Sequence, residues 1–115
     1  MTTPRALALA GSLLFAAAGC APHVRAVVAN ESGARLTDLR IHGEQDSTRV
    51  RDLAPGESVV VAARVRGEDV VALRGRCDGR PLRPAMGAYV EPGYGVRLAV
   101  DSLGAVRVTV RATGY

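Results

Sequence analysis

The sequence predicts an all-β protein, with a single antiparallel β-sandwich of about seven or eight strands after an N-terminal signal peptide. Three observations predict this fold class. From Val24 onward, apolar residues stand two apart with polar residues between them, which is the period of a half-buried strand and not of a helix. Valine is prominent in these runs, and its branched Cβ suits a pleated strand. Residues that favour turns separate the runs at the short spacing typical of sandwiches.

The start of the chain has the pattern of an export signal. Arg5 and the α-amino group precede residues 6–19, which are all apolar or small. This run is shorter than the about 20 residues that a membrane-spanning helix needs, and it ends in small residues, as at a signal cleavage site. We therefore expect residues 1–19 to be removed from the mature protein.

Residues 15–20, with the sequence FAAAGC, resemble the lipobox of bacterial lipoproteins. The resemblance implies that Cys20 receives a diacylglyceryl group on its thiol and becomes the first residue of the mature chain. Ala18 and Gly19 match the pattern of the family, whereas Ala17 stands where the family prefers Leu. The alternative is an ordinary signal cut after Ala18, which leaves Cys20 and Cys77 able to form a disulfide in an oxidising compartment.

The mature chain has room for one small domain. Removal of residues 1–19 from the 115 leaves 96 residues, enough for a modest core. We expect residues 20–23 to be a lipid-anchored tether and residues 24–115 to be the β-sandwich domain. All fifteen basic residues are Arg and they only modestly outnumber the eleven acidic ones, without aromatic residues interleaved, so nucleic acid is not an expected partner.

Five runs show the strand alternation most clearly. In each run, one set of side chains is expected to face the core. These inward sets are Thr37, Leu39 and Ile41; Val59, Val61, Ala63 and Val65; Val71, Leu73, Gly75 and Cys77; Val96, Leu98 and Val100; and Val106, Val108 and Val110. We expect the centre of the core to be formed by Val61, Val65, Leu73, Leu98 and Val108.

Turn chemistry predicts one hairpin with particular clarity. Asp78 and Gly79 both tolerate the positive φ that a tight hairpin turn requires, so the strands that end at Cys77 and start at Arg80 are expected to pair. Pro81 and Pro84 cannot donate hydrogen bonds to a ladder, which makes the second strand an edge or irregular strand.

Residues 53–58, with the sequence LAPGES, resemble the turn before a strand in bacterial immunoglobulin-like and fibronectin-like modules. The mature chain as a whole is similar to small uncharacterised lipoproteins built from one such sandwich. The buried Trp of immunoglobulin domains, packed against a disulfide, is absent from this sequence, which contains no Trp.

The sequence offers no pattern for catalysis, and we expect a protein that is not an enzyme and needs no metal or cofactor. His23 and His42 have no other metal ligand at a suitable spacing. Cys77 alternates with apolar residues, which predicts a small core residue rather than an exposed nucleophile.

Two sets of residues are candidates for binding. Arg64, Arg66, Arg74 and Arg76 are expected to project outward from consecutive strands. In rows on one sheet face, their guanidinium groups would receive phosphate or carboxylate groups of lipopolysaccharide, anionic phospholipid or peptidoglycan. The alternative is a solvated face whose charge is cancelled by interleaved acidic residues.

Tyr89 and Tyr94 flank a Pro-Gly turn, where two phenol rings would suit a contact with a protein partner or a sugar. The alternative is that the rings cover the end of a core that is otherwise short of aromatic residues.

These features together predict an envelope lipoprotein that is held at a membrane by lipid on Cys20 and acts as a non-catalytic binding or structural module. In a Gram-negative organism, Ala21 after the lipidated cysteine resembles the sorting pattern for the outer membrane, facing the periplasm. One alternative is an accessory subunit of an envelope assembly or secretion complex, and another is a small envelope enzyme.

Overall fold

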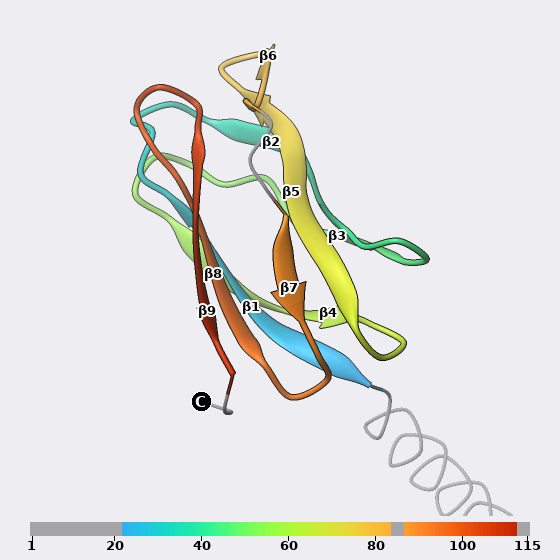
Figure 1. Cartoon of the computed structure of the whole chain (residues 1–115). Helices are drawn as coiled ribbons and strands as arrows, with labels where there is room; N and C mark the ends of the chain where they lie inside the picture. The colour runs from blue at the N-terminus through green and yellow to red at the C-terminus, as the bar shows by residue number, and fades with distance from the viewer. Residues whose placement is uncertain (1–21, 84–86, 113–115) are drawn as a thin grey trace, which may run out of the picture.

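The computed structural model describes residues 22–83 and 87–112, which form nine strands and no helix (Figure 1). The strands are β1 (His23–Asn30), β2 (Leu36–His42), β3 (Ser47–Arg49), β4 (Ser58–Arg64), β5 (Asp69–Cys77), β6 (Arg80–Pro81), β7 (Ala88–Val90), β8 (Gly95–Val100) and β9 (Val106–Arg111). The first strand begins at His23, a residue that the sequence analysis assigned to the tether.

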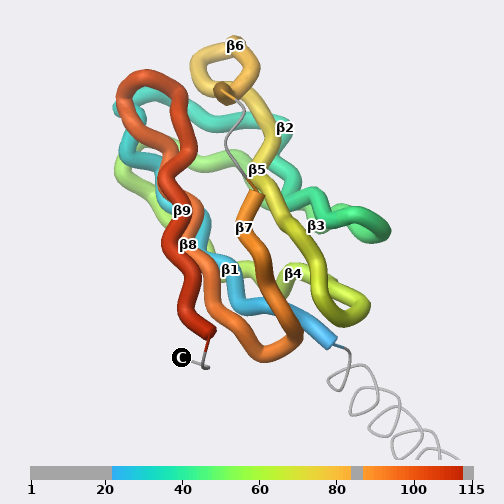
Figure 2. Tube along the Cα trace, viewed as in Figure 1, coloured from blue at the N-terminus to red at the C-terminus, as the bar shows by residue number. Residues whose placement is uncertain are grey.

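The strands form two sheets that pack face to face, which confirms the predicted β-sandwich (Figure 2). The first sheet has the order β4-β1-β8-β9, and the second has the order β3-β2-β5-β6, with β7 also paired to β5. Nine strands are found where seven or eight were expected, and three of them, β3, β6 and β7, are only two or three residues long.

One strand pair departs from the antiparallel prediction. β1 and β8 are parallel, and Val28 lies opposite Leu98. Parallel neighbours cannot be joined by a hairpin and need a long connection, and here the whole second sheet lies between the two strands in the chain. Turn residues specify only hairpins between successive strands, so no local sequence pattern predicts the pairing of β1 with β8.

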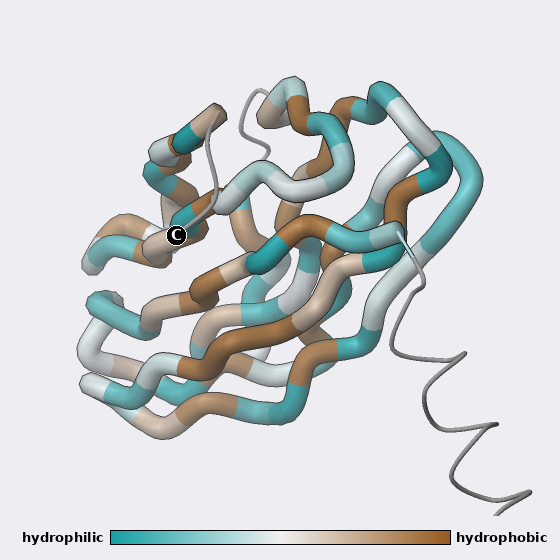
Figure 3. The backbone as a smooth tube through the Cα atoms, turned by 90° about the horizontal axis from the view of Figure 1, so that it is seen from below, coloured by the Kyte–Doolittle hydropathy of each residue, from teal (hydrophilic) through white to brown (hydrophobic). Residues whose placement is uncertain are grey.

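The core lies between the sheets, and apolar and polar segments alternate along the strands around it (Figure 3). Val65, Leu73 and Leu98 are buried, as predicted. Val61 and Val108 are only partly buried, and Val110 is exposed, because β4 and β9 are the edge strands of the first sheet and have a neighbour on one side only.

A bulge in β2 reverses the predicted alternation at its start. Asp38, with φ of 53°, and Leu39 together stand opposite Gly75, so that Leu36 is buried and Thr37 lies opposite the exposed Arg76. The prediction that Thr37 faces the core was therefore wrong. A Cβ at Gly75 would come within 2.7 Å of the Leu39 side chain, so the bulge requires glycine at this position.

The hairpin at Asp78 and Gly79 is confirmed. Both residues have positive φ, of 52° and 76°, and Cys77 pairs with Arg80 in the short strand β6. Pro81 lies in this edge strand, whereas Pro84 lies outside the described residues.

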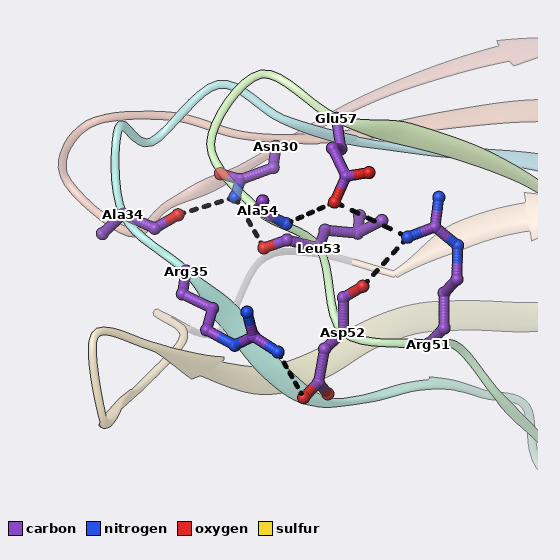
Figure 4. Close-up of polar contacts among 8 residues, drawn as sticks. All are labelled: Asn30, Ala34, Arg35, Arg51, Asp52, Leu53, Ala54 and Glu57. Carbon is purple, nitrogen blue, oxygen red and sulfur yellow. Dashed lines mark hydrogen bonds and ion pairs between the residues drawn. The ribbon is translucent and has the colours of Figure 1, made fainter.

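Asn30 joins the two sheets at one end of the sandwich (Figure 4). It is buried at the end of β1, and its Nδ2 donates to the carbonyl oxygens of Ala34, at 2.6 Å, and Leu53, at 3.1 Å. Its Oδ1 accepts from the backbone nitrogen and hydroxyl of Ser32. Because Leu53 also exchanges two backbone hydrogen bonds with Leu36 of β2, the amide of Asn30 connects the first sheet to the second.

We expect Asn30→Ala to lower the free energy of unfolding by about 2–3 kcal/mol, because it removes both donors and the acceptor from a buried site. Chemical denaturation of the full chain measures this change. Gln45→Ala, which removes an exposed amide from a loop, is the control and should change the value by less than about 0.5 kcal/mol. Equal effects of the two substitutions would show that the amide of Asn30 does not stabilise the fold.

Candidate anion-binding site

Cys20 lies outside the described residues, as does the whole of the expected signal, residues 1–19. Only Ala21 and Pro22 stand between Cys20 and the first residue of β1. Among the described residues, no helix is long and apolar enough to cross a membrane.

The structure does not bring the four predicted arginines together on one face. Arg64 ends β4 in the first sheet, Arg66 follows it in the connection, and Arg74 and Arg76 belong to β5 in the second sheet. All four are exposed. The sequence shows that these side chains alternate outward, but it does not show that the chain passes from one sheet to the other between Arg66 and β5.

Two of the four arginines are already engaged by carboxylates. The Nε of Arg66 lies 3.1 Å from Oδ2 of Asp46, and the Nε of Arg76 lies 3.8 Å from Oδ2 of Asp38. Arg76 also donates to the carbonyl oxygen of Gly79, at 3.0 Å. The exposed pair of Arg76 and Asp38 contributes little to stability, but both pairs reduce the positive charge available to a ligand.

Three arginines, of which only Arg74 belongs to the predicted four, form a row across the second sheet. Arg40 on β2 lies directly opposite Arg49 on β3 and, on its other side, directly opposite Arg74 on β5. Side chains at such positions project from the same face, with Cβ atoms about 4.5–5.5 Å apart. All three are exposed. We call Arg49, Arg40 and Arg74 the arginine row.

The arginine row has no ion-pair partner in the part of the chain that the structure describes. Within residues 22–83 and 87–112, no carboxylate forms an ion pair with Arg40, Arg49 or Arg74, and no hydrogen bond from their side chains is found. Like charges directly opposite each other destabilise a sheet. The row therefore has unused capacity to bind an anion, and an anion bound there would relieve its repulsion.

The outer face of the first sheet differs in this respect. Arg97 of β8 and Arg107 of β9 both donate to the carboxylate of Glu31, one to each oxygen. The hydrogen bond from Arg97, followed by that from Arg107, lowers the pKa of Glu31 below its ordinary value of 4.5. The arginines of this face are thus partly neutralised within the fold.

The face that carries the arginine row also carries two half-exposed apolar side chains, Val70 and Tyr89, which we call the apolar pair. Next to the row along the strands lie Ala72 and His42, which are opposite each other. Beyond them, Val70 of β5 lies opposite Tyr89 of β7, and these side chains are 47% and 49% exposed. Partial desolvation of the ring, together with the nearby charge of Glu68, raises the pKa of Tyr89.

Tyr94 behaves differently from Tyr89. Its ring packs against the core, and its hydroxyl donates to Oε2 of Glu91 at 2.8 Å, a hydrogen bond that raises its pKa. The placement of Tyr94 matches the alternative in which the rings cover the end of the core, whereas Tyr89 remains available for contacts.

The other candidate residues, Cys77, His23 and His42, do not come together in one site. Cys77 is a free thiol that is partly buried and packs against the core. His23 lies on β1 and His42 on β2, in different sheets. In the described part of the chain, no group of three or more His, Cys, Asp and Glu side chains is placed to hold a metal ion.

A second cationic surface lies at the end of the sandwich near β6. Arg80 and Arg83 line an open hollow of about 420 Å³, together with Asp78 and Ser102. A carboxylate therefore shares this hollow with the two guanidinium groups, unlike the arginine row.

No family model matches this chain, and no curated protein matches it in sequence. Among solved structures, the chain is similar to the NMR structure of a protein from Eubacterium rectale. The TM-score is 0.55 and the sequence identity is 13%, over 79% of this chain and 90% of that one. At this identity the likeness shows the shared fold alone.

We expect the ion pairs of Glu31 to make stability depend on pH. The pKa of Glu31 is lower in the folded protein than its ordinary value of 4.5. The stabilisation that its ion pairs provide is therefore present above pH 4.5, and it is lost as the pH falls through the lower pKa of the folded protein. The wild type should therefore be slightly more stable than Glu31→Gln at neutral pH, and the difference should close in acid. Denaturation at a series of pH values measures this.

The control for this prediction is Glu44→Gln, since Glu44 is exposed and its side chain has no ion pair with any described residue. A difference between wild type and Glu31→Gln that stays constant down to the lowest pH would contradict the role given to Arg97 and Arg107.

Proposed function

We propose that this protein is a bacterial envelope lipoprotein, held at a membrane by lipid on Cys20, whose β-sandwich is a non-catalytic binding module. The apolar run of residues 6–19, followed by Cys20, supports the anchor. In a Gram-negative organism, Ala21 favours the outer membrane, with the domain in the periplasm.

The start of β1 supports a close attachment. Cys20 is three residues before His23, a distance of at most about 10 Å in an extended chain. The turn between β7 and β8 lies at the same end of the sandwich, because Gly93 donates a backbone hydrogen bond to His23. The start of β1 and this turn share one end of the sandwich (Figure 1). Lipid on Cys20 would therefore hold this end of the domain next to the bilayer.

The arginine row is the observation that carries the binding role. Exposed guanidinium groups without carboxylate partners recognise anions, but they supply neither a nucleophile nor a base at neutral pH. A binding function thus needs nothing beyond the groups that this sheet face presents.

A subunit of an envelope assembly or secretion complex is the second candidate. Val60 is 54% exposed on the edge strand β4, and Leu103 is 69% exposed in the turn between β8 and β9. Exposed apolar side chains of this kind favour a protein partner. Purification from native membranes distinguishes the two candidates, because a subunit should be recovered with one defined complex in fixed proportion.

We expect the full chain, expressed in a bacterial host, to enter the detergent phase as a processed lipoprotein, and Cys20→Ser to accumulate as an uncleaved precursor. The thiol of Cys20 is the atom that would receive the lipid, so its loss should block the cleavage that follows. Phase partitioning and mass spectrometry of the N-terminus measure both outcomes.

Cys77→Ser is the matched control, because it removes the other thiol of the chain and should leave processing unchanged. Normal cleavage of the Cys20→Ser protein to a soluble form would mean that the signal is an ordinary one.

A further inference from the structure

We propose that the arginine row binds the phosphate groups of a phosphorylated glycan, whose sugar rings pack on the adjacent Val70 and Tyr89. This inference deepens the binding role proposed above and names the chemistry of the ligand. The arginine row, Val70 and Tyr89 carry the inference, and the lipid anchor enters only where a glycan is favoured over a bilayer surface.

The charge of this face favours a ligand with more than one negative group. Arg49, Arg40 and Arg74 lie on three neighbouring strands. Strands are about 4.8 Å apart, so the row spans about 10 Å. A phosphate ester offers oxygens that a guanidinium group binds through two parallel hydrogen bonds, and it carries up to about two negative charges. Two phosphates close together match this row better than one carboxylate.

The apolar pair gives the site a second half. Val70 and Arg74 project from the same face of β5, four residues apart, which corresponds to about 13 Å along the strand. The half-exposed ring of Tyr89 and the methyl groups of Val70 can cover the apolar face of a sugar. A ligand long enough to reach from Arg74 to Tyr89 is a short oligosaccharide rather than an isolated phosphate.

The position of the row favours a glycan over a bilayer surface. The start of β1, which the anchor would hold at the membrane, belongs to the first sheet, whereas the row lies on the outer face of the second sheet. Val70, near the start of β5, is closer to that anchored end than Arg74 is. A lipidated domain would therefore present its end to the bilayer and its arginine row to a chain approaching from the side.

The test compares a phosphorylated malto-oligosaccharide with its unphosphorylated parent, using the full chain in a neutral detergent at low salt. Isothermal titration calorimetry should detect binding of the phosphorylated compound only. Arg40→Gln should weaken this binding by about tenfold or more, since Arg40 is the centre of the row. Arg107→Gln removes the same charge from the other sheet, and it should change the affinity by less than about threefold because this contact is remote.

Two further measurements separate a binding defect from a folding defect and define the two halves of the site. Arg40→Gln should leave the thermal midpoint of the free protein unchanged or higher, because it removes repulsion between opposed like charges. Tyr89→Ala should weaken binding of the phosphorylated oligosaccharide but leave binding of tripolyphosphate unchanged.

Three results would overturn the inference. The first is equal binding of the phosphorylated and unphosphorylated compounds. The second is equal loss of affinity in Arg40→Gln and Arg107→Gln, which would indicate a general effect of net charge. The third is binding to phosphatidylglycerol vesicles that requires Arg40, without binding of the oligosaccharide, which would identify a bilayer as the ligand. In each case, the fate of Cys20→Ser still decides the lipoprotein proposal separately.

Discussion

The hydrogen bonds of Asn30 set the relation between the two sheets. A buried amide is tolerated only where its donors and acceptor find partners, and here they are found in the turn after β1 and at Leu53. Leu53 in turn pairs with Leu36, the first residue of β2. The start of β2 is thereby fixed relative to β1, and so is every later position on that strand, including Arg40.

The bulge in β2 then decides which side chains face solvent. Leu36 faces the core, and an uninterrupted alternation from there would turn Arg40 inward as well. The extra residue at Asp38 and Leu39 reverses the alternation, so that Leu39 and Ile41 are buried and Arg40 points outward. The close packing of Gly75 against Leu39 makes this possible. The arginine row thus depends on a local irregularity of the backbone.

Sequence reasoning reached the fold class because alternation and turn chemistry are local. It identified Leu73 and Leu98 as core residues and the hairpin at Asp78, all of which depend on a few neighbouring residues. It missed the parallel pair of β1 and β8, and it grouped Arg64 with Arg74 although they lie in different sheets, because strand pairing over long distances leaves no local pattern. One sequence feature does indicate the bulge: Leu36 and Leu39 are three residues apart, whereas inward residues of a regular strand are separated by an even number.

The contrast between the two outer faces bears on why the row exists. In the first sheet, Arg97 and Arg107 both form ion pairs with Glu31, so their positive charges are used within the folded protein. In the second sheet, three arginines oppose one another without such a carboxylate among the described residues, and like charges in these positions disfavour the folded state. A local arrangement that disfavours the folded state is expected where a site serves binding, because its unfavourable interactions are relieved only when the ligand is present. This asymmetry supports the choice of the second sheet, rather than the first, as the face of the proposed anion site.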